Sequence, residues 1–270
     1  MVFSAIVPFL FVLLTALKTP PSRWWVVATS ALIVPFAWFF RDTGFPASSE
    51  DTALWGLFAT AAGCLALRFH FIVPALIRFG LIAALLWLCY PAWLAEEGGT
   101  GRKFLICFLA ADCIIGASLG AELATAKSRL SFAALIPPAI GIAILLQLGG
   151  AMRFGQTTGA VAAVLAAFCV IILWKKPDFN KAAPVSAIAV SLIGLFALSG
   201  WLFAEIRWGL AIMVFVAPLL SWIASFLPLL NKSPFQIMLR DFIASALIVI
   251  PVSVIAISAY LAESAESEGY

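Results

Sequence analysis

Long apolar runs separated by short polar breaks repeat along the whole chain. The breaks read KTPPSR, RDTGFPASSED, EEGGTGRK, ATAKSR, GGAMRFGQ, KKPDFNK and NKSPFQIMLRD. Most of them combine charged residues with Gly or Pro, which is typical punctuation between helices. Most runs approach the roughly 20 apolar residues that cross a bilayer as an α-helix. The pattern therefore predicts an all-α fold, a polytopic integral membrane bundle of about ten transmembrane helices.

We expect the spans at 2–17, 24–40, 52–67, 79–95, 104–123, 130–148, 158–174, 184–203, 208–230 and 242–261. The polar breaks between these spans are short, so consecutive helices should lie side by side and antiparallel. The prediction for 1–270 is thus a single transmembrane domain with no soluble domain.

The segment from Arg68 to Arg78 is too apolar for an ordinary loop. One interpretation is an interfacial connection. The other is that the fourth span begins near Phe71 and carries Arg78 inside. We favour the interfacial connection, because a charged side chain within the bilayer costs a few kcal/mol.

Dividing the chain after Arg129 gives two halves, 1–129 and 130–270, with five predicted spans each. An odd number of spans in each half forces opposite orientations, the inverted repeat found in many transporters. Pro8 and the pair Pro137–Pro138 lie at comparable depths in the first and sixth spans. No further residues match between the halves, so the inverted 5+5 repeat is a hypothesis resting on topology and this one similarity.

Composition supports the membrane class and excludes others. Hydrophobic residues make up 64% of the 270-residue chain and charged residues 11%, whereas soluble domains are about a quarter charged. The net charge of +3 is too small and dispersed to predict nucleic-acid binding. The expected partner is the lipid bilayer, with other membrane subunits or a homo-oligomer as open alternatives.

The distribution of charge predicts how the bundle is oriented. Most of the 16 Lys and Arg residues fall in the loops that follow odd-numbered spans. The positive-inside rule places these loops in the cytoplasm. We therefore expect a protein integral to a bacterial inner membrane, with its N- and C-termini outside the cytoplasm.

The stretch FLAADCIIGASLGAEL, residues 108–123, carries a carboxylate in the middle of an apolar run. On a helix, Gly116 lies about 40° and Gly120 about 80° from Asp112 around the axis. Glycines spaced in this way allow two helix backbones to approach closely. The pattern predicts that Asp112 is buried in the bundle near the middle of the bilayer.

Two roles for Asp112 remain open at this point. A buried carboxylate can bind and release a proton, so the residue could form a proton or cation site. Alternatively, a protonated Asp112 could donate a hydrogen bond to a neighbouring helix and only hold the bundle together.

The sequence IPPAIG, residues 136–141, is the second candidate feature. Pro137, Pro138 and Gly141 could break the sixth span into half-helices, and such breaks line transporter sites. A simple kink is the alternative, and we favour it because proline is frequent in membrane helices. Gln147, near the end of this span, could line a pathway, although a hydrogen bond between helices is the favoured role.

Glu122 lies at the end of the fifth span, at the level of Arg78 and Arg129. We expect an interfacial ion pair among these residues, since long charged side chains can reach the membrane surface. A gate is the alternative.

Two common enzyme motifs are absent from the sequence. The chain has no GxxxxGK[ST] or HExxH motif, and its single histidine excludes a multi-histidine metal site. We expect no catalytic residues, metal or cofactor.

The favoured function is a small secondary transporter, proton-coupled through Asp112, with Gly116, Gly120 and the proline pair near its pathway. The alternative is a non-catalytic membrane subunit or scaffold in which the Asp112 face only packs helices.

Overall fold

The computed structural model describes residues 2–39, 72–88, 92–127, 129–175, 182–203, 206–226 and 233–267. Every regular element in these ranges is helical, in agreement with the predicted all-α class. The α-helices are α1 (Val2–Ala16), α2 (Trp24–Phe39), α4 (Ile72–Leu88), α5 (Ala92–Ala126), α6 (Ile136–Leu148), α7 (Met152–Lys175), α8 (Ala183–Phe203), α9 (Trp208–Val216), α10 (Pro218–Ala224) and α11 (Pro234–Ser267). Short 3-10 helices, η1 (Pro21–Arg23) and η4 (Phe132–Leu135), precede α2 and α6.

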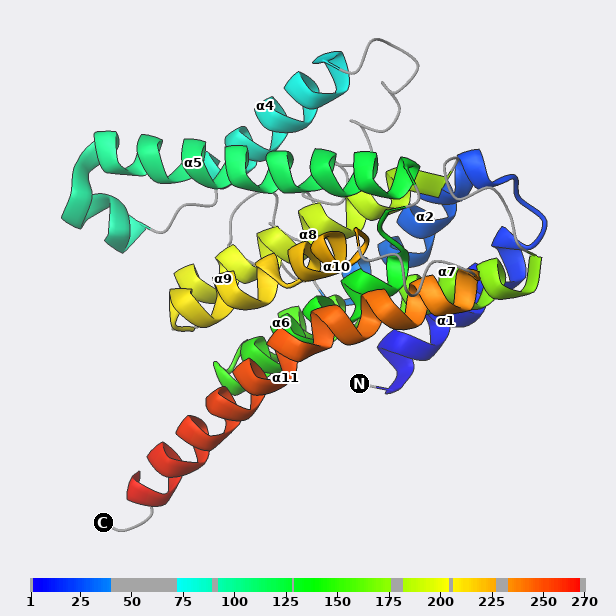
Figure 1. Cartoon of the computed structure of the whole chain (residues 1–270). Coiled ribbons are helices and arrows are strands. Elements are labelled where there is room, and N and C mark those ends of the chain that lie inside the picture. The colour runs from blue at the N-terminus through cyan, green and yellow to red at the C-terminus, as the bar shows by residue number, and fades with distance from the viewer. Residues whose placement is uncertain are drawn as a thin grey trace.

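The main hydrophobic core lies around α6, α7 and α8. Helices α1 and α2 pack against α7, and α11 packs against α6. On the other side of α8, helix α5 joins α4 through a smaller core that includes Ile82, Ala111 and Ile114. Figure 1 shows α5 along one side of the molecule and the end of α11 projecting beyond the other helices.

Four described helical segments are long and apolar enough to cross a membrane: Gly99–Ala126, Met152–Lys175, Ala183–Leu202 and Pro234–Ala265. The described shorter apolar helices are Ala5–Ala16, Ala75–Leu88, Phe132–Leu148 and Trp208–Ala224. These helices and the composition indicate an integral membrane protein. The count of ten spans is not confirmed, and the predicted span 52–67 lies outside the described residues. The inverted repeat and the location of the termini stay predictions.

The fourth predicted span begins earlier than expected. Helix α4 starts at Ile72, so Arg78 lies within it, and only 1% of that residue is exposed. The favoured interpretation of 68–78 as an interfacial connection is therefore wrong for 72–78. Arg78 is accommodated inside because a carboxylate of the neighbouring helix α5 neutralises it, as described below.

Two predicted spans are discontinuous, and proline is the cause in both. The span 130–148 begins as the 3-10 helix η4, and Pro137 and Pro138 occupy the first turn of α6. The span 208–230 ends one α-helix at Val216 and begins another at Pro218. Because proline lacks an N–H group, it fits a helix start but interrupts a helix interior. The favoured kink inside the sixth span is therefore wrong, since the proline pair begins α6.

Candidate functional site

A groove of about 410 Å³ lies between α5, the start of α6, α8 and the broken pair α9–α10. The residues that line it from α5 include Gly116 and Gly120, and those from the other walls include Pro138, Phe215 and Pro218. Ligand pockets commonly enclose roughly 300–1,000 Å³, so the groove is large enough for a small molecule or one aliphatic chain. We refer to it as the α5–α10 groove.

Glycine keeps the α5 wall of this groove open. Gly116 and Gly120 are exposed, and a methyl group added to either would meet no atom within 4 Å. The missing side chains therefore leave free volume above the helix backbone. The groove opens here onto the outer surface of the bundle, where the neighbouring Leu123 is also exposed.

Proline forms the opposite walls. Pro138, in the first turn of α6, and Pro218, at the start of α10, both line the groove. The Ala217 N–H reaches only the Val214 carbonyl, at 3.3 Å, and Pro218 has no N–H to offer that oxygen. Interrupted backbone within a membrane is tolerated where it lines a cavity or is covered by protein. The two breaks meet at one such cavity.

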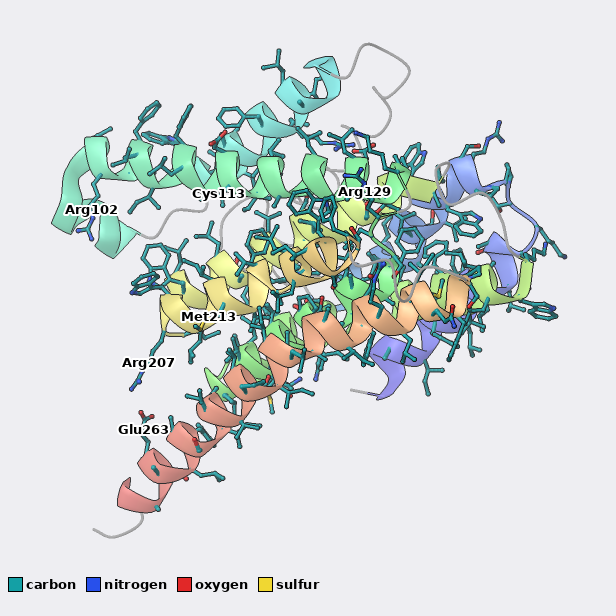
Figure 2. All side chains as sticks on the ribbon, in the orientation of Figure 1. Arg102, Cys113, Arg129, Arg207, Met213 and Glu263 are labelled. Carbon is teal, nitrogen blue, oxygen red and sulfur yellow. The ribbon has the colours of Figure 1, made fainter. Side chains whose placement is uncertain are left out.

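Two cations stand at one end of the groove. Lys127 and Arg129 both line it and are exposed, and the Arg129 guanidinium lies 5.0 Å from the centre of the Phe226 ring. Figure 2 shows Arg129 near one end of α5 and Arg102 near the other. The remaining described lining residues are apolar or glycine. We call Lys127 and Arg129 the cationic rim.

A buried polar cluster fixes the backbone behind this rim. The Asp241 carboxylate is fully buried in α11 and accepts a hydrogen bond from the Ser131 backbone N–H at 2.7 Å. Its other oxygen accepts hydrogen bonds from Arg240 Nε at 2.8 Å and from an Arg240 terminal nitrogen at 2.6 Å. The carboxylate therefore joins α11 to the segment that connects the rim to η4.

Helix α10 belongs to the same cluster. The Ser221 hydroxyl donates a hydrogen bond of 2.7 Å to the Asp241 backbone carbonyl and lies 2.9 Å from the Ser245 hydroxyl. Asp241 falls in the polar break NKSPFQIMLRD, so the apolar pattern predicted a loop there and did not reveal this cluster. The available signals were Pro234, a favoured residue in a first helical turn, and Ser245, one helical turn beyond Asp241.

The structure does not bury Asp112. The residue is exposed on α5 and does not line the groove, so the prediction of a carboxylate enclosed by the bundle is wrong. The buried face of α5 instead carries Ala111, Ile114 and Ser118. The pattern identified a real shared face, because Asp112, Gly116 and Gly120 are all exposed, but this face points out of the bundle.

The other predicted pathway residues do not form one site. Gly116, Gly120 and Pro138 line the α5–α10 groove, whereas the described lining does not include Pro137 or Gly141. A methyl group added at Gly141 would lie 2.6 Å from the Val249 side chain, so this glycine permits close packing of α6 and α11. Gln147 lines a second cavity of about 430 Å³ between α1, α6 and α7.

The predicted ion pair forms only in part. A terminal nitrogen of Arg78 lies 2.9 Å from Glu122 Oε2, with side-chain exposures of 1% and 14%. This pair joins α4 to α5 inside the bundle rather than at an exposed interface. Arg129 belongs to the groove and stacks on Phe226 instead.

Metal ligands do not cluster in the part of the chain that the structure describes. No group of three or more His, Cys, Asp or Glu side chains there could hold a metal ion. The described cysteines, Cys107, Cys113 and Cys169, are free thiols. The chain significantly matches no protein-family model, no curated protein and no solved structure.

Proposed function

We propose that the protein is a secondary membrane carrier that binds a small amphipathic molecule in the α5–α10 groove. The observation that carries this proposal is the meeting of two proline breaks, at Pro138 and Pro218, with the open glycine face of α5 around one cavity. Carriers commonly bind substrate where helices are discontinuous. The apolar walls favour an aliphatic part of the ligand, and the cationic rim favours a polar end.

The proposal does not use Asp112 as a proton carrier. The exposed carboxylate lies outside the groove, so it contributes no charge to the lining. Movement is instead expected at the junction of α9 and α10, since a few residues at the ends of helices absorb most hinge motion. Ala217 and Pro218 form this junction.

A thiol accessibility experiment tests the carrier without knowledge of the substrate. The five natural cysteines are replaced, and single cysteines are introduced as Gly116→Cys in the groove and Gly80→Cys on α4. Both glycines are exposed helical positions where an added side chain meets no atom within 4 Å. Membrane vesicles of either orientation are then treated with a membrane-impermeant maleimide.

Alternating access exposes the groove to each side of the membrane in turn. Gly116→Cys should therefore react from both sides, whereas Gly80→Cys, which lies outside the groove, should react from neither. Reaction of Gly116→Cys from one side only, or from neither, contradicts a carrier that uses this groove.

The exposed Asp112 favours a second candidate, a membrane subunit that functions in an assembly. The residue lies midway along the Gly99–Ala126 helix, next to exposed Phe108 and Leu109. Roughly 2.5–3.5 kcal/mol opposes a charged aspartate at the centre of a membrane helix, so this face is unfavourable against lipid. A helix of another chain that forms a hydrogen bond with Asp112 would remove this penalty. The simplest such partner is a second copy of the same chain.

Cys113 allows a direct test, because it is exposed and adjacent to Asp112. If two copies meet across this face, mild oxidation in the membrane should give a disulfide-linked dimer. Cys113→Ala should abolish the dimer, and Asp112→Leu should reduce it. An oxidised chain that remains monomeric contradicts this form of the subunit hypothesis.

A further inference from the structure

The two charged residues of the α5–α10 groove have the same sign. Lys127 and Arg129 line one end, and no acidic side chain occurs among the described lining residues. The groove is therefore electrostatically asymmetric, with a positive end and an apolar body. A ligand that matches it carries a negative group at one end of an aliphatic chain.

Nearby carboxylates do not neutralise this rim. Glu122, near the end of α5 and five residues before Lys127, forms an ion pair with Arg78 at 2.9 Å. Asp241, which holds the neighbouring Ser131, forms an ion pair with Arg240 at 2.6 Å. Both nearby acids are engaged by other cations, and among the described residues no carboxylate lies within ion-pair distance of either rim cation.

The backbone of the rim is fixed before any ligand arrives. The Arg129 and Leu130 N–H groups both donate to the Ala124 carbonyl, at 2.8 and 3.3 Å. Ser131, two residues after Arg129, donates its backbone N–H to the buried Asp241 carboxylate. A preordered backbone reduces the conformational entropy lost when a ligand binds.

We propose that the ligand of the α5–α10 groove is an acidic membrane phospholipid, with its phosphate at Lys127 and Arg129 and an acyl chain along the apolar walls. Basic pockets between membrane helices bind acidic lipid headgroups, and each Lys or Arg contributes favourably. This proposal deepens the proposed function and rests on it, since both concern the same groove.

The test measures binding of two single-chain lipids of equal chain length to the purified full-length protein by native mass spectrometry. The probes are lysophosphatidylglycerol, which is anionic, and lysophosphatidylcholine, which is zwitterionic. The double variant Lys127→Gln/Arg129→Gln removes the rim charge, and Gly120→Leu fills the groove. The matched controls are Lys18→Gln/Arg23→Gln, another exposed pair in a short connection, and Gly80→Leu, another open glycine.

The wild-type protein should prefer the anionic lipid by roughly tenfold or more, given two cations near the phosphate. The neutral rim variant should lose this preference while retaining lysophosphatidylcholine, and Gly120→Leu should lose both lipids. The charge-retaining swap Lys127→Arg/Arg129→Lys should keep the preference. The two control variants should behave as wild type.

The remaining outcomes distinguish the two proposals. If Gly120→Leu lowers binding of both lipids but the wild type shows no preference, the acidic-lipid proposal fails and the groove remains a carrier site. If Gly120→Leu leaves both lipids bound, neither lipid occupies the groove, and the carrier proposal then depends on Gly116→Cys labelling. Displacement of lysophosphatidylglycerol by inorganic phosphate at equal concentration would show a site for free anions and overturn the commitment to a lipid.

Discussion

Ser131 and Asp241, separated by 110 positions in the chain, are joined by a hydrogen bond of 2.7 Å between the Ser131 N–H and Asp241 Oδ2. This bond fixes the start of η4 to α11. The Asp241 carbonyl accepts a second bond from Ser221 of α10. One residue thus holds both the segment behind the cationic rim and the helix that begins at Pro218.

Loss of the Asp241 charge should destabilise the protein. Asp241→Asn retains an oxygen that can accept the Ser131 N–H but leaves the buried Arg240 guanidinium beside a neutral group. Removing one partner of a buried ion pair costs about 3–5 kcal/mol, and the retained hydrogen bond favours the lower end. The midpoint of thermal unfolding in detergent, followed by circular dichroism, should fall clearly.

Glu263→Gln is the control for this variant. Glu263 lies on the same helix, is exposed and is visible near its end in Figure 2. Exposed substitutions usually change stability by less than about 0.5 kcal/mol. Equal melting of Asp241→Asn and Glu263→Gln would show that the buried cluster does not stabilise the fold.

The ion pair between Arg78 and Glu122 should show strong coupling. Arg78→Gln and Glu122→Gln each leave one charge inside the bundle, whereas the double variant removes both. Each single substitution should cost about 3 kcal/mol. The double variant should cost at least about 1 kcal/mol less than the sum of the two.

A double-mutant cycle in detergent measures this coupling directly. An exposed interfacial pair of the kind first expected would give only about 0.2–1 kcal/mol. Additive losses would place the pair in solvent and contradict its burial between α4 and α5.

Gly155 permits a close approach between α7 and α6. A methyl group added there would lie 2.8 Å from the Ala143 carbonyl oxygen, which belongs to the backbone and cannot rotate away. Gly155→Ala should therefore force the helices apart and cost about 1–3 kcal/mol of unfolding free energy.

Gly159→Ala, one turn further along α7, is the matched control. An added methyl group there meets no atom within 4 Å, so the variant should gain up to about 1 kcal/mol from helix propensity. The midpoints of thermal unfolding of the two variants are compared with that of the wild type. A Gly155→Ala protein as stable as Gly159→Ala would contradict the close approach of α7 to α6 at Gly155.

The positions of many helices followed directly from the apolar pattern. The predicted spans 2–17, 24–40 and 184–203 differ by about one residue from Val2–Ala16, Trp24–Phe39 and Ala183–Phe203. Polar residues at both ends of an apolar run set where the helix begins and ends, so the run alone predicts its boundaries. The apolar pattern did not predict that Arg78 lies inside a helix. The free-energy cost of burying this charge is offset by Glu122, a partner 44 positions away in the chain.

Periodicity identified the shared face of α5 but not its direction. Asp112, Gly116 and Gly120 lie together as expected, yet the opposite face, with Ala111 and Ile114, is the buried one. In a membrane both faces of a helix are apolar, so hydrophobicity does not distinguish lipid from protein. Gly116 and Gly120 line the groove together with Pro138, whereas the Asp112 carboxylate lies outside it.

Pro218→Ala should join α9 and α10 into one helix and alter the groove. Ala217 already has helical dihedral angles, φ −50° and ψ −37°, so an N–H at position 218 could donate to the Val214 carbonyl. Recovering this bond should raise stability, since an interior proline costs about 3 kcal/mol, of which only part is recovered here. The straightened helix would move Leu219 and Trp222, which line the groove.

Pro251→Ala separates this effect from a general gain in helicity. Pro251 lies inside α11, is exposed and does not line the groove. Both substitutions should raise the unfolding temperature, but only Pro218→Ala should slow maleimide labelling of Gly116→Cys and weaken lysophosphatidylglycerol binding. If both substitutions affect labelling equally, the break at Pro218 does not shape the groove, and the site would then depend on the glycine face of α5 and on Pro138 alone.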